Sequence, residues 1–138
     1  MKPSNSDLIE EQLKKRNIYY KMLCMWFWAE SHGRSVSRYL FDCGYRQVAI
    51  YGMAEIGELL YYELIKAELE IPFVIDQNMS ILCECPIISP ECDIPRADLI
   101  IVTPEYYIEE ITEMLRRKTD VPVMSIQQAI CYATGFAM

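Results

Sequence analysis

The chain has 138 residues, of which 52% are hydrophobic and 24% are charged, and its formal net charge is -7. This length suits one domain and leaves no room for separate cofactor and substrate domains. The acidic charge repels phosphate backbones and anionic lipid headgroups, which argues against nucleic acid as a partner. The N-terminus is too polar for a secretory signal, and the longest apolar run, residues 22–29, is far shorter than the ~18 residues of a membrane-spanning helix. We therefore expect a cytoplasmic protein with no membrane span.

Residues 1–45 have the pattern of a helical segment. Ser4 or Ser6 can cap a first long helix, and a second, short helix fits residues 35–43. Five apolar residues recur at helical spacing along the first helix: Ile9, Leu13, Tyr20, Leu23 and Phe27. We treat this segment as a unit that precedes an α/β domain over residues 46–138.

The uninterrupted apolar run in the first helix predicts a contact between copies of the chain. A helix that packs on one small domain needs a single apolar stripe, whereas residues 22–29 are apolar on every side. We expect the surplus side to expose tryptophan and methionine, and residues 19–30 to form the contact of a homodimer, the commonest closed assembly. The alternative is that the two N-terminal helices and the sheet enclose the run.

Residues 46–138 alternate short apolar runs with amphipathic helices, which is typical of βαβ units and a parallel sheet. Strands are expected at four places, with a short edge strand at 86–88: 47–51, 72–75, 98–102 and 121–124. Amphipathic helices fit residues 55–70 and 105–118, and Ser125 with Gln128 forms a capping box for a last short helix. The pattern predicts an α/β fold, a parallel sheet with helices on both faces.

A glycine turn after the first strand is the main candidate site. In the fingerprint G-x-G-x-x-G the glycines permit a tight turn, the approach of a pyrophosphate, and close packing of helix on strand. Gly52 and Gly57 match the first and third positions, whereas Ala54 replaces the second. Asp76 follows the second strand, where a ribose-binding carboxylate is expected. Glu55 opposes this interpretation, because its carboxylate can satisfy the positive helix end without a ligand.

These residues carry a resemblance to a known family. The stretches IYGMAEIGELLYYEL, FVIDQN and ADLIIVTP resemble the N-terminal Rossmann-like domains of bacterial polysaccharide-biosynthesis proteins, the nucleotide-sugar dehydratases and sugar acyltransferases. The resemblance covers about residues 47–130. It implies a nucleotide, dinucleotide or CoA-like ligand, with NAD as a candidate cofactor. The implied binding residues are Gly52, Met53, Ala54, Glu55, Ile56, Gly57, Asp76 and Thr103.

No catalytic group and no metal site is predicted. The only histidine, His32, follows a helix end, which favours a surface or capping role. Cys83 and Cys85 lack the two-residue gap usual for zinc ligands, and we expect the cysteines to be reduced. Tyr62 and Lys66 match the Y-x-x-x-K pair of short-chain dehydrogenases, but they lie on the helix that the glycine turn opens, which carries them away from the strand ends.

Three functions are consistent with these features. The first is a non-catalytic binding or regulatory module for a nucleotide, dinucleotide or nucleotide-sugar, linked to bacterial surface-polysaccharide biosynthesis. The second is a subunit of an NAD-dependent sugar-nucleotide enzyme that a partner chain completes. The third is an interaction domain that has lost the ligand. The first is preferred because the binding elements are present in outline and catalytic groups are not. Fold alone does not separate the three.

Overall fold

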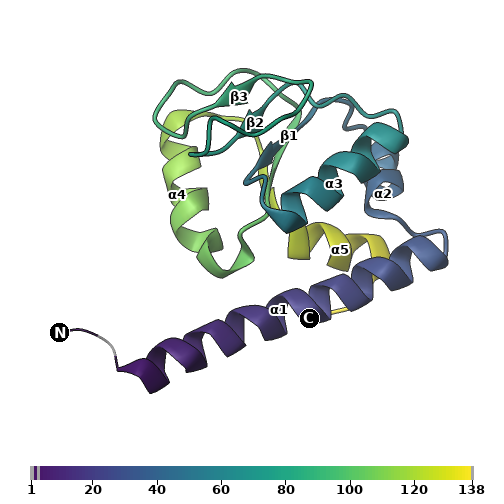
Figure 1. Ribbon diagram of the computed structural model, residues 1–138. Coiled ribbons are helices and arrows are strands. Elements are labelled where there is room, and N and C mark those ends of the chain that lie inside the picture. The colour runs from purple at the N-terminus through teal and green to yellow at the C-terminus, as the bar shows by residue number, and fades with distance from the viewer. Residues whose placement is uncertain (1, 3, 138) are drawn as a thin grey trace.

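The computed structural model describes residue 2 and residues 4–137, and within them the chain forms one five-stranded sheet. All strands are parallel, in the order β3-β2-β1-β4-β5 (Figure 1). The strands are β1 (Val48–Tyr51), β2 (Val74–Ile75), β3 (Ile87–Ile88), β4 (Leu99–Val102) and β5 (Val123–Ser125). The chain adds strands outward from β1 to β3 and then returns to the other side of β1, which is the Rossmann-like order. The predicted α/β fold class is confirmed, and β3 is the edge strand expected at 86–88.

Helices cover both faces of the sheet. They are α1 (Asn5–Ser31), α2 (Val36–Asp42), α3 (Glu55–Lys66), α4 (Ile108–Lys118) and α5 (Ile126–Thr134), with a 3-10 turn η1 (Glu105–Tyr107) before α4. Figure 1 shows α4 on one side of the sheet and α3 and α5 on the other, with α1 running beneath. Within the described residues, no helix is both long enough and apolar enough to cross a membrane.

The core has two parts because side chains alternate along each strand. Val48 and Ile50 of β1 face a cluster that includes residues of α1, α2, α3 and α5. Ala49 faces the opposite cluster, to which α4 contributes Leu115. Residues 1–45 supply Met22, Trp26, Val36 and Leu40 to the first cluster, so the N-terminal helices share a core with the sheet.

The predicted helix over 55–70 ends four residues early. After Lys66 the chain turns at Glu68, whose φ of 64° lies in the left-handed region. The N–H of Leu69 donates to the carbonyl of Leu64 at 3.0 Å, and that of Glu68 donates to Ile65 at 3.0 Å. These two bonds form a Schellman cap, which here uses glutamate where glycine is the usual residue. Without a glycine, the sequence contains no stop signal at this position.

The long helix α1 buries a different side from the one that its apolar spacing suggests. Met22, Trp26 and Ala29 are buried against the domain. The five regularly spaced apolar residues are all exposed: Ile9, Leu13, Tyr20, Leu23 and Phe27. The expectation that tryptophan and methionine would be exposed is wrong for Trp26 and Met22, since the N-terminal helices and the sheet enclose them. The side of α1 that remains uncovered presents Tyr20, Leu23 and Phe27 instead.

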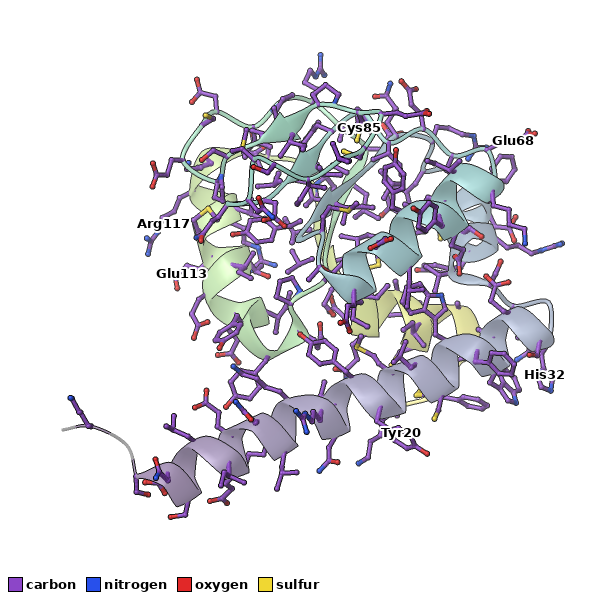
Figure 2. The ribbon with its side chains drawn as sticks, viewed as in Figure 1. Tyr20, His32, Glu68, Cys85, Glu113 and Arg117 are labelled. Atoms are coloured by element: carbon purple, nitrogen blue, oxygen red, sulfur yellow. The ribbon has the colours of Figure 1, made fainter. Side chains whose placement is uncertain are left out.

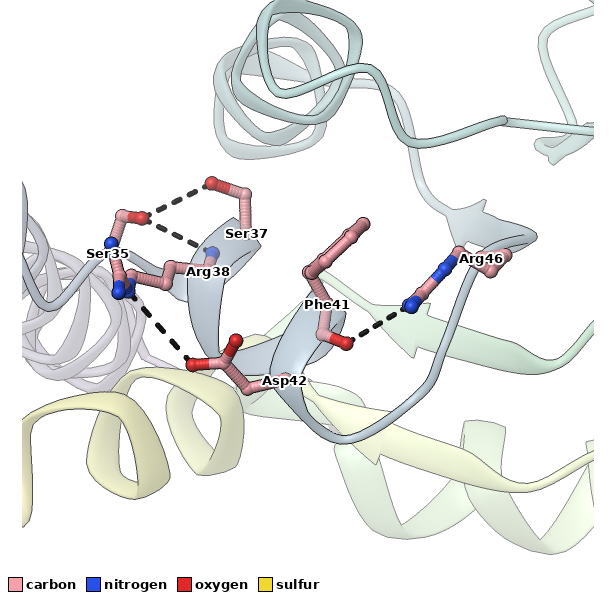
Figure 3. A network of polar contacts seen from close by, with 6 residues as sticks. All are labelled: Ser35, Ser37, Arg38, Phe41, Asp42 and Arg46. Atoms are coloured by element: carbon pink, nitrogen blue, oxygen red, sulfur yellow. Dashed lines mark hydrogen bonds and ion pairs between the residues drawn. The ribbon is translucent and has the colours of Figure 1, made fainter.

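Helix α2 is short and is held by side chains at both ends (Figure 3). The Ser35 hydroxyl accepts a hydrogen bond from the Arg38 N–H at 3.2 Å, as an N-cap does. Arg46 donates to the Phe41 carbonyl at 2.9 Å, and its guanidinium lies 3.8 Å from the centre of the Phe41 ring. These contacts fix the link between the N-terminal helices and β1.

Candidate functional site

A cavity of about 600 Å³ lies at the carboxyl ends of the central strands. In open α/β sheets, ligands bind at this edge, where the strand order reverses. Here the reversal lies between β1 and β4. The lining residues come from the glycine turn, the ends of β2 and β4, and α1: Arg16, Tyr19, Tyr20, Leu23, Gly52, Ala54, Glu55, Ile56, Asp76, Thr103 and Pro104. Six of the eight sequence-predicted residues therefore meet at one place.

The two predicted residues that do not line the cavity have other surroundings. Met53 is half-buried, and its side chain packs against the core cluster on the α3 side of the sheet. Gly57 is buried beneath the turn, where an added Cβ would lie 1.8 Å from the carbonyl oxygen of Gly52. This distance is far inside van der Waals contact, so Gly57 lets α3 approach the turn closely, as the third glycine of the fingerprint does.

Gly52 is required by the backbone of the turn. Its φ of 91° lies in the region that residues with a Cβ avoid. A Cβ here would also lie 2.8 Å from the Thr103 hydroxyl and 2.9 Å from the Pro104 ring. The N–H of Gly52 donates to Ile75 at 2.8 Å, which continues the sheet into the turn. Substitution at Gly52 therefore strains the backbone and also displaces the end of β4.

The Asp76 and Thr103 side chains hold the same turn. One Asp76 oxygen accepts from the Met53 N–H at 2.7 Å, and the other accepts from the Asn78 N–H at 2.8 Å. The buried Thr103 hydroxyl donates toward the carbonyl of Gly52 at 2.7 Å. Asp76 follows β2 and Thr103 follows β4, and both already make hydrogen bonds within the chain. A carboxylate has capacity beyond two bonds, so Asp76 retains acceptor sites that a ligand hydroxyl can use.

The N-terminus of α3 is the polar end of the cavity. Its N-cap residue, Ala54, makes no side-chain capping bond. The first N–H groups of a helix have no partner within the helix and carry its partial positive charge. Glu55 and Glu58 lie in this first turn. An anion, from a ligand or from Glu55, is the species that this end of the helix favours.

Helix α1 supplies a wall of the cavity that the sequence did not predict. Arg16, Tyr19, Tyr20 and Leu23 line it from the side opposite the sheet. Lys15 anchors α1 here by donating to the Tyr107 hydroxyl at 2.5 Å, with its ammonium 5.0 Å from the centre of the Tyr106 ring. Arg16 is exposed and forms no ion pair with any described residue. No local pattern in the sequence places α1 across the strand ends.

Glu105 is the carboxylate nearest the ends of β4 and β5. Its Oε1 accepts from the Ser125 hydroxyl at 3.0 Å, whereas its Oε2 is buried with no hydrogen-bond partner among the described residues. Burial raises the pKa of Glu105, and the bond from Ser125 opposes that rise. Glu105 therefore serves the N-terminus of α5, where a negative charge is stabilising.

The carboxyl group with the largest pKa shift is that of Glu63, which lies outside the cavity, where α1, α2 and α3 meet. Glu63 accepts from the Trp26 indole N–H and from the Ser37 N–H, each at 2.7 Å. Burial, followed by a hydrogen bond with the Glu30 carboxyl group, raises the pKa of Glu63 to about 7. The arrangement couples the protonation of one side chain to the contact of three helices.

The remaining candidates lie outside the lining of the cavity. His32 is the C-cap of α1, which confirms the capping role, and Figure 2 shows it at the end of that helix. Its ring stacks on Trp28 with centroids 4.0 Å apart. The Cys83 and Cys85 sulfurs lie 3.7 Å apart, and no group of three or more potential metal ligands occurs in the described part of the chain. Tyr62 is 61% exposed on α3 and does not line the cavity.

Comparisons with protein-family models, with curated proteins and with solved structures found no match to this chain. Function is therefore inferred from the fold and from the geometry of the cavity.

Proposed function

We propose that the chain is a non-catalytic binding or regulatory module for a nucleotide, dinucleotide or nucleotide-sugar. The observation that supports the proposal is the cavity at the strand-order reversal, which brings the Gly52 turn, Asp76 and Arg16 to one place. The resemblance of the glycine turn to polysaccharide-biosynthesis domains extends the proposal to a role in bacterial surface-polysaccharide biosynthesis. In this proposal the protein works in the cytoplasm.

The proposed ligand has a definite orientation. Its phosphate faces the N–H groups at the start of α3 and the guanidinium of Arg16, because both favour negative charge. Its ribose hydroxyls face the free acceptor sites of Asp76. Its base lies against the wall that Tyr19, Tyr20 and Leu23 form, since aromatic faces stack on bases.

NAD is the proposed dinucleotide, in preference to NADP. The Asp76 carboxylate accepts hydrogen bonds from ribose hydroxyls and repels a 2′-phosphate. Titration of the protein with each dinucleotide should therefore give a lower dissociation constant for NAD. An equal or lower constant for NADP would remove Asp76 from the binding site.

A second candidate function is an interaction domain that has lost the ligand. It is favoured by the hydrogen bonds that Asp76 and Thr103 make to the turn itself, because these bonds give both side chains partners within the chain. The methyl group of Ala54 and the carboxylate of Glu55 stand where a phosphate would approach. In this case the cavity is a structural remnant, and the protein acts through its surface.

We also propose a homodimer through the uncovered side of residues 19–30. With Trp26 and Met22 buried, the contact is assigned to Tyr20, Leu23 and Phe27. Tyr20 and Leu23 also line the cavity, so this contact and the proposed ligand share those two side chains.

The deciding experiment measures binding of NAD, NADP, CoA and a UDP-sugar by calorimetry and by the shift of the melting temperature. We expect at least one of them to bind the unmodified chain. Gly52→Val should abolish that binding, because valine resists the positive φ and crowds the phosphate. Arg16→Gln, at an exposed position that leaves the fold intact, should raise the dissociation constant about 10-fold, the loss of one charge-assisted hydrogen bond.

Lys14→Gln is the matched control, because Lys14 is an exposed cation of α1 that does not line the cavity. It should leave binding unchanged. Binding that survives both Gly52→Val and Arg16→Gln would place the ligand elsewhere, and absence of binding by all four compounds would favour the interaction domain.

A further inference from the structure

The exposed side of α1 carries a heptad repeat. Its residues alternate in steps of four and three along the helix: Ile9, Leu13, Arg16, Tyr20, Leu23 and Phe27. This 3.5-residue spacing defines the a and d positions of a coiled coil, whereas a stripe that packs on a globular core is wider and follows a period of 3.6. We name these six residues the α1 seam.

The core of the domain does not use the α1 seam, although Arg16, Tyr20 and Leu23 also line the cavity at the strand ends. Phe27 is 76% exposed and Tyr20 is 70% exposed, although both belong to a helix whose opposite side buries Met22, Trp26 and Ala29. Figure 2 shows Tyr20 on the outer side of α1. Large apolar side chains that are contiguous and exposed mark a contact surface, because single scattered ones would need no explanation.

The first six residues of α1 also lack support from the domain. The first tertiary contact of a charged side chain along α1 is that of Lys15, and every residue from 5 to 10 is exposed. Figure 1 shows this end of α1 extending beyond the rest of the chain. These turns extend a helix that is already nucleated, so they need no second nucleation, but they gain no burial from the domain. A second surface that covers them would supply that burial.

We propose that two copies of the chain pair their α1 seams as an antiparallel coiled coil. In this register Ile9 of one copy meets Phe27 of the other, Leu13 meets Leu23, and Arg16 meets Tyr20. Every a position then faces a d position, as antiparallel pairing of heptads requires. The proposal specifies the proposed homodimer and rests on it. Arg16, Tyr20 and Leu23 belong both to the seam and to the cavity wall, so pairing and ligand binding each need their own measurement.

Arg16 decides the orientation. A parallel pair would bring Arg16 against Arg16 of the second copy in an apolar seam, where like charges are strongly unfavourable. The antiparallel pair places each guanidinium over the Tyr20 ring of the second copy, which is a favourable cation–π contact. The seam therefore has one orientation in which its only charged member finds a partner.

A groove beside the α1 seam can accept the N-terminal end of α1 from the second copy. A groove of about 630 Å³ lies between α1 and α3, with Leu23, Phe27 and Leu59 among its lining residues. In the antiparallel register, the unsupported first turns of the second copy run along this groove. Pairing would therefore cover the groove of one copy and, at the same time, the exposed first turns of α1 of the other copy.

The available area suits a stable dimer. Tyr62 of α3, one turn from Leu59, is 61% exposed. At about 200 Å² for a whole aromatic side chain, the exposed parts of Phe27, Tyr20 and Tyr62 alone offer roughly 400 Å² per copy. A standard interface buries about 800 Å² per partner, and the four aliphatic residues of the seam and groove supply much of the remainder.

The first test measures the mass of the unmodified protein by sedimentation or light scattering at micromolar concentration. We expect twice the mass of one chain. Phe27→Asp and Leu13→Asp, both at exposed positions that leave the fold intact by circular dichroism, should each raise the dimer dissociation constant at least about 30-fold. Leu82→Asp is the control, since Leu82 is 98% exposed and lies outside the groove. A monomer, or a dimer that both variants leave intact, overturns the proposal.

The second test determines the orientation of the two helices. Ile9→Cys and Phe27→Cys are made in separate chains that also carry Cys24→Ser, which removes the exposed native thiol of this surface. Oxidation of the mixture should join the two introduced cysteines, and oxidation of either chain alone should not. A disulfide within the Ile9→Cys dimer alone would show a parallel pair and overturn the register, while leaving the dimer itself and the ligand proposal standing.

Discussion

Helices α1 and α4 contribute to the same domain, but only α4 is explained by that domain. The apolar residues of α4, Ile108, Ile111 and Leu115, all turn toward the sheet, and its exposed side carries charged residues such as Glu113 and Arg117. Helix α1 buries Met22 and Trp26 on one side and exposes the apolar seam on another. Packing on the domain accounts for the apolar stripe of α4 and for the buried stripe of α1. The exposed stripe of α1 indicates a contact with a further surface.

This difference explains which face of each helix could be predicted. On α4 the apolar period and the buried side coincide, so the pattern identifies the contact with the sheet. On α1 both sides carry an apolar period, because Ile18, Met22, Trp26 and Ala29 on the buried side also follow steps of four, four and three. Hydrophobic period therefore identifies a face that makes a contact, and does not say with which partner.

The largest expected effect is a difference in unfolding free energy between variants on the buried side of α1 and variants on its exposed side. Trp26→Ala should lower the free energy of unfolding by about 3–5 kcal/mol, because it empties a buried volume and leaves Glu63 without the indole donor. Leu115→Ala should cost about 2–5 kcal/mol on α4 for the same packing reason. Phe27→Ala, in dilute protein where copies are separate, should change stability by less than about 0.5 kcal/mol. Urea unfolding of the three variants checks this order.

The control is to measure unfolding of the unmodified chain and of Phe27→Ala at several protein concentrations. Phe27→Ala should lose the concentration dependence of unfolding that the unmodified chain shows, because a dimer is stabilised by mass action. A cost at Phe27 comparable with that at Trp26 in dilute protein would mean that the seam faces the domain's own core.

The next effect concerns carboxyl groups beside the two helices. Glu113 of α4 is exposed and pairs with Arg117 at 2.5 Å, whereas Glu63, beside α1, has its pKa raised to about 7. Between pH 4.5 and about 7 the folded chain then holds a proton that the unfolded chain releases. Unfolding free energy should therefore fall as pH rises through this window, by up to about 3 kcal/mol.

Urea unfolding at a series of pH values measures the slope. Glu63→Gln should flatten the profile over this window, and Glu30→Gln should narrow it, since the Glu30 carboxyl group is the second cause of the raised pKa. Glu113→Gln should leave the profile as it is. A profile that rises from pH 4.5 to 7 would show that Glu63 is ionised in the folded chain.

Much of the sheet was predictable because strands and turns are local in the sequence. Each apolar run became a strand, the Ser125 and Gln128 capping box formed, and Gly52, Asp76 and Thr103 gathered at one edge. Parallel strands impose that last result, since their carboxyl ends share an edge. The extents were less accurate: the expected strand over 72–75 pairs only at Val74 and Ile75.

The cavity wall from α1 could not be predicted in this way. Arg16 and Tyr19 reach the strand ends because α1 packs on α5 and η1, which are both far from it in the sequence. Nothing near Arg16 in the sequence records that contact. The sequence predicts Ser4 or Ser6 as the N-cap of α1, and Ser4 is the N-cap in the structure.

The smallest effect should separate two capping boxes of the same chemistry. Ser125 and Ser4 each accept from the N–H three residues on, at 3.0 and 3.2 Å, but Ser125 begins a helix of the core and Ser4 begins the unsupported end of α1. Ser125→Ala should lower the unfolding free energy by about 1–2 kcal/mol, within the range for a lost cap. Ser4→Ala should change it by less than about 0.5 kcal/mol in dilute protein, because fraying of the first turns leaves the core folded.

The same substitution, Ser4→Ala, should raise the dimer dissociation constant roughly 2-fold, since the antiparallel pair uses those turns. Sedimentation of the Ser4→Ala chain measures this, and an unchanged dissociation constant would place the first turns of α1 outside the contact.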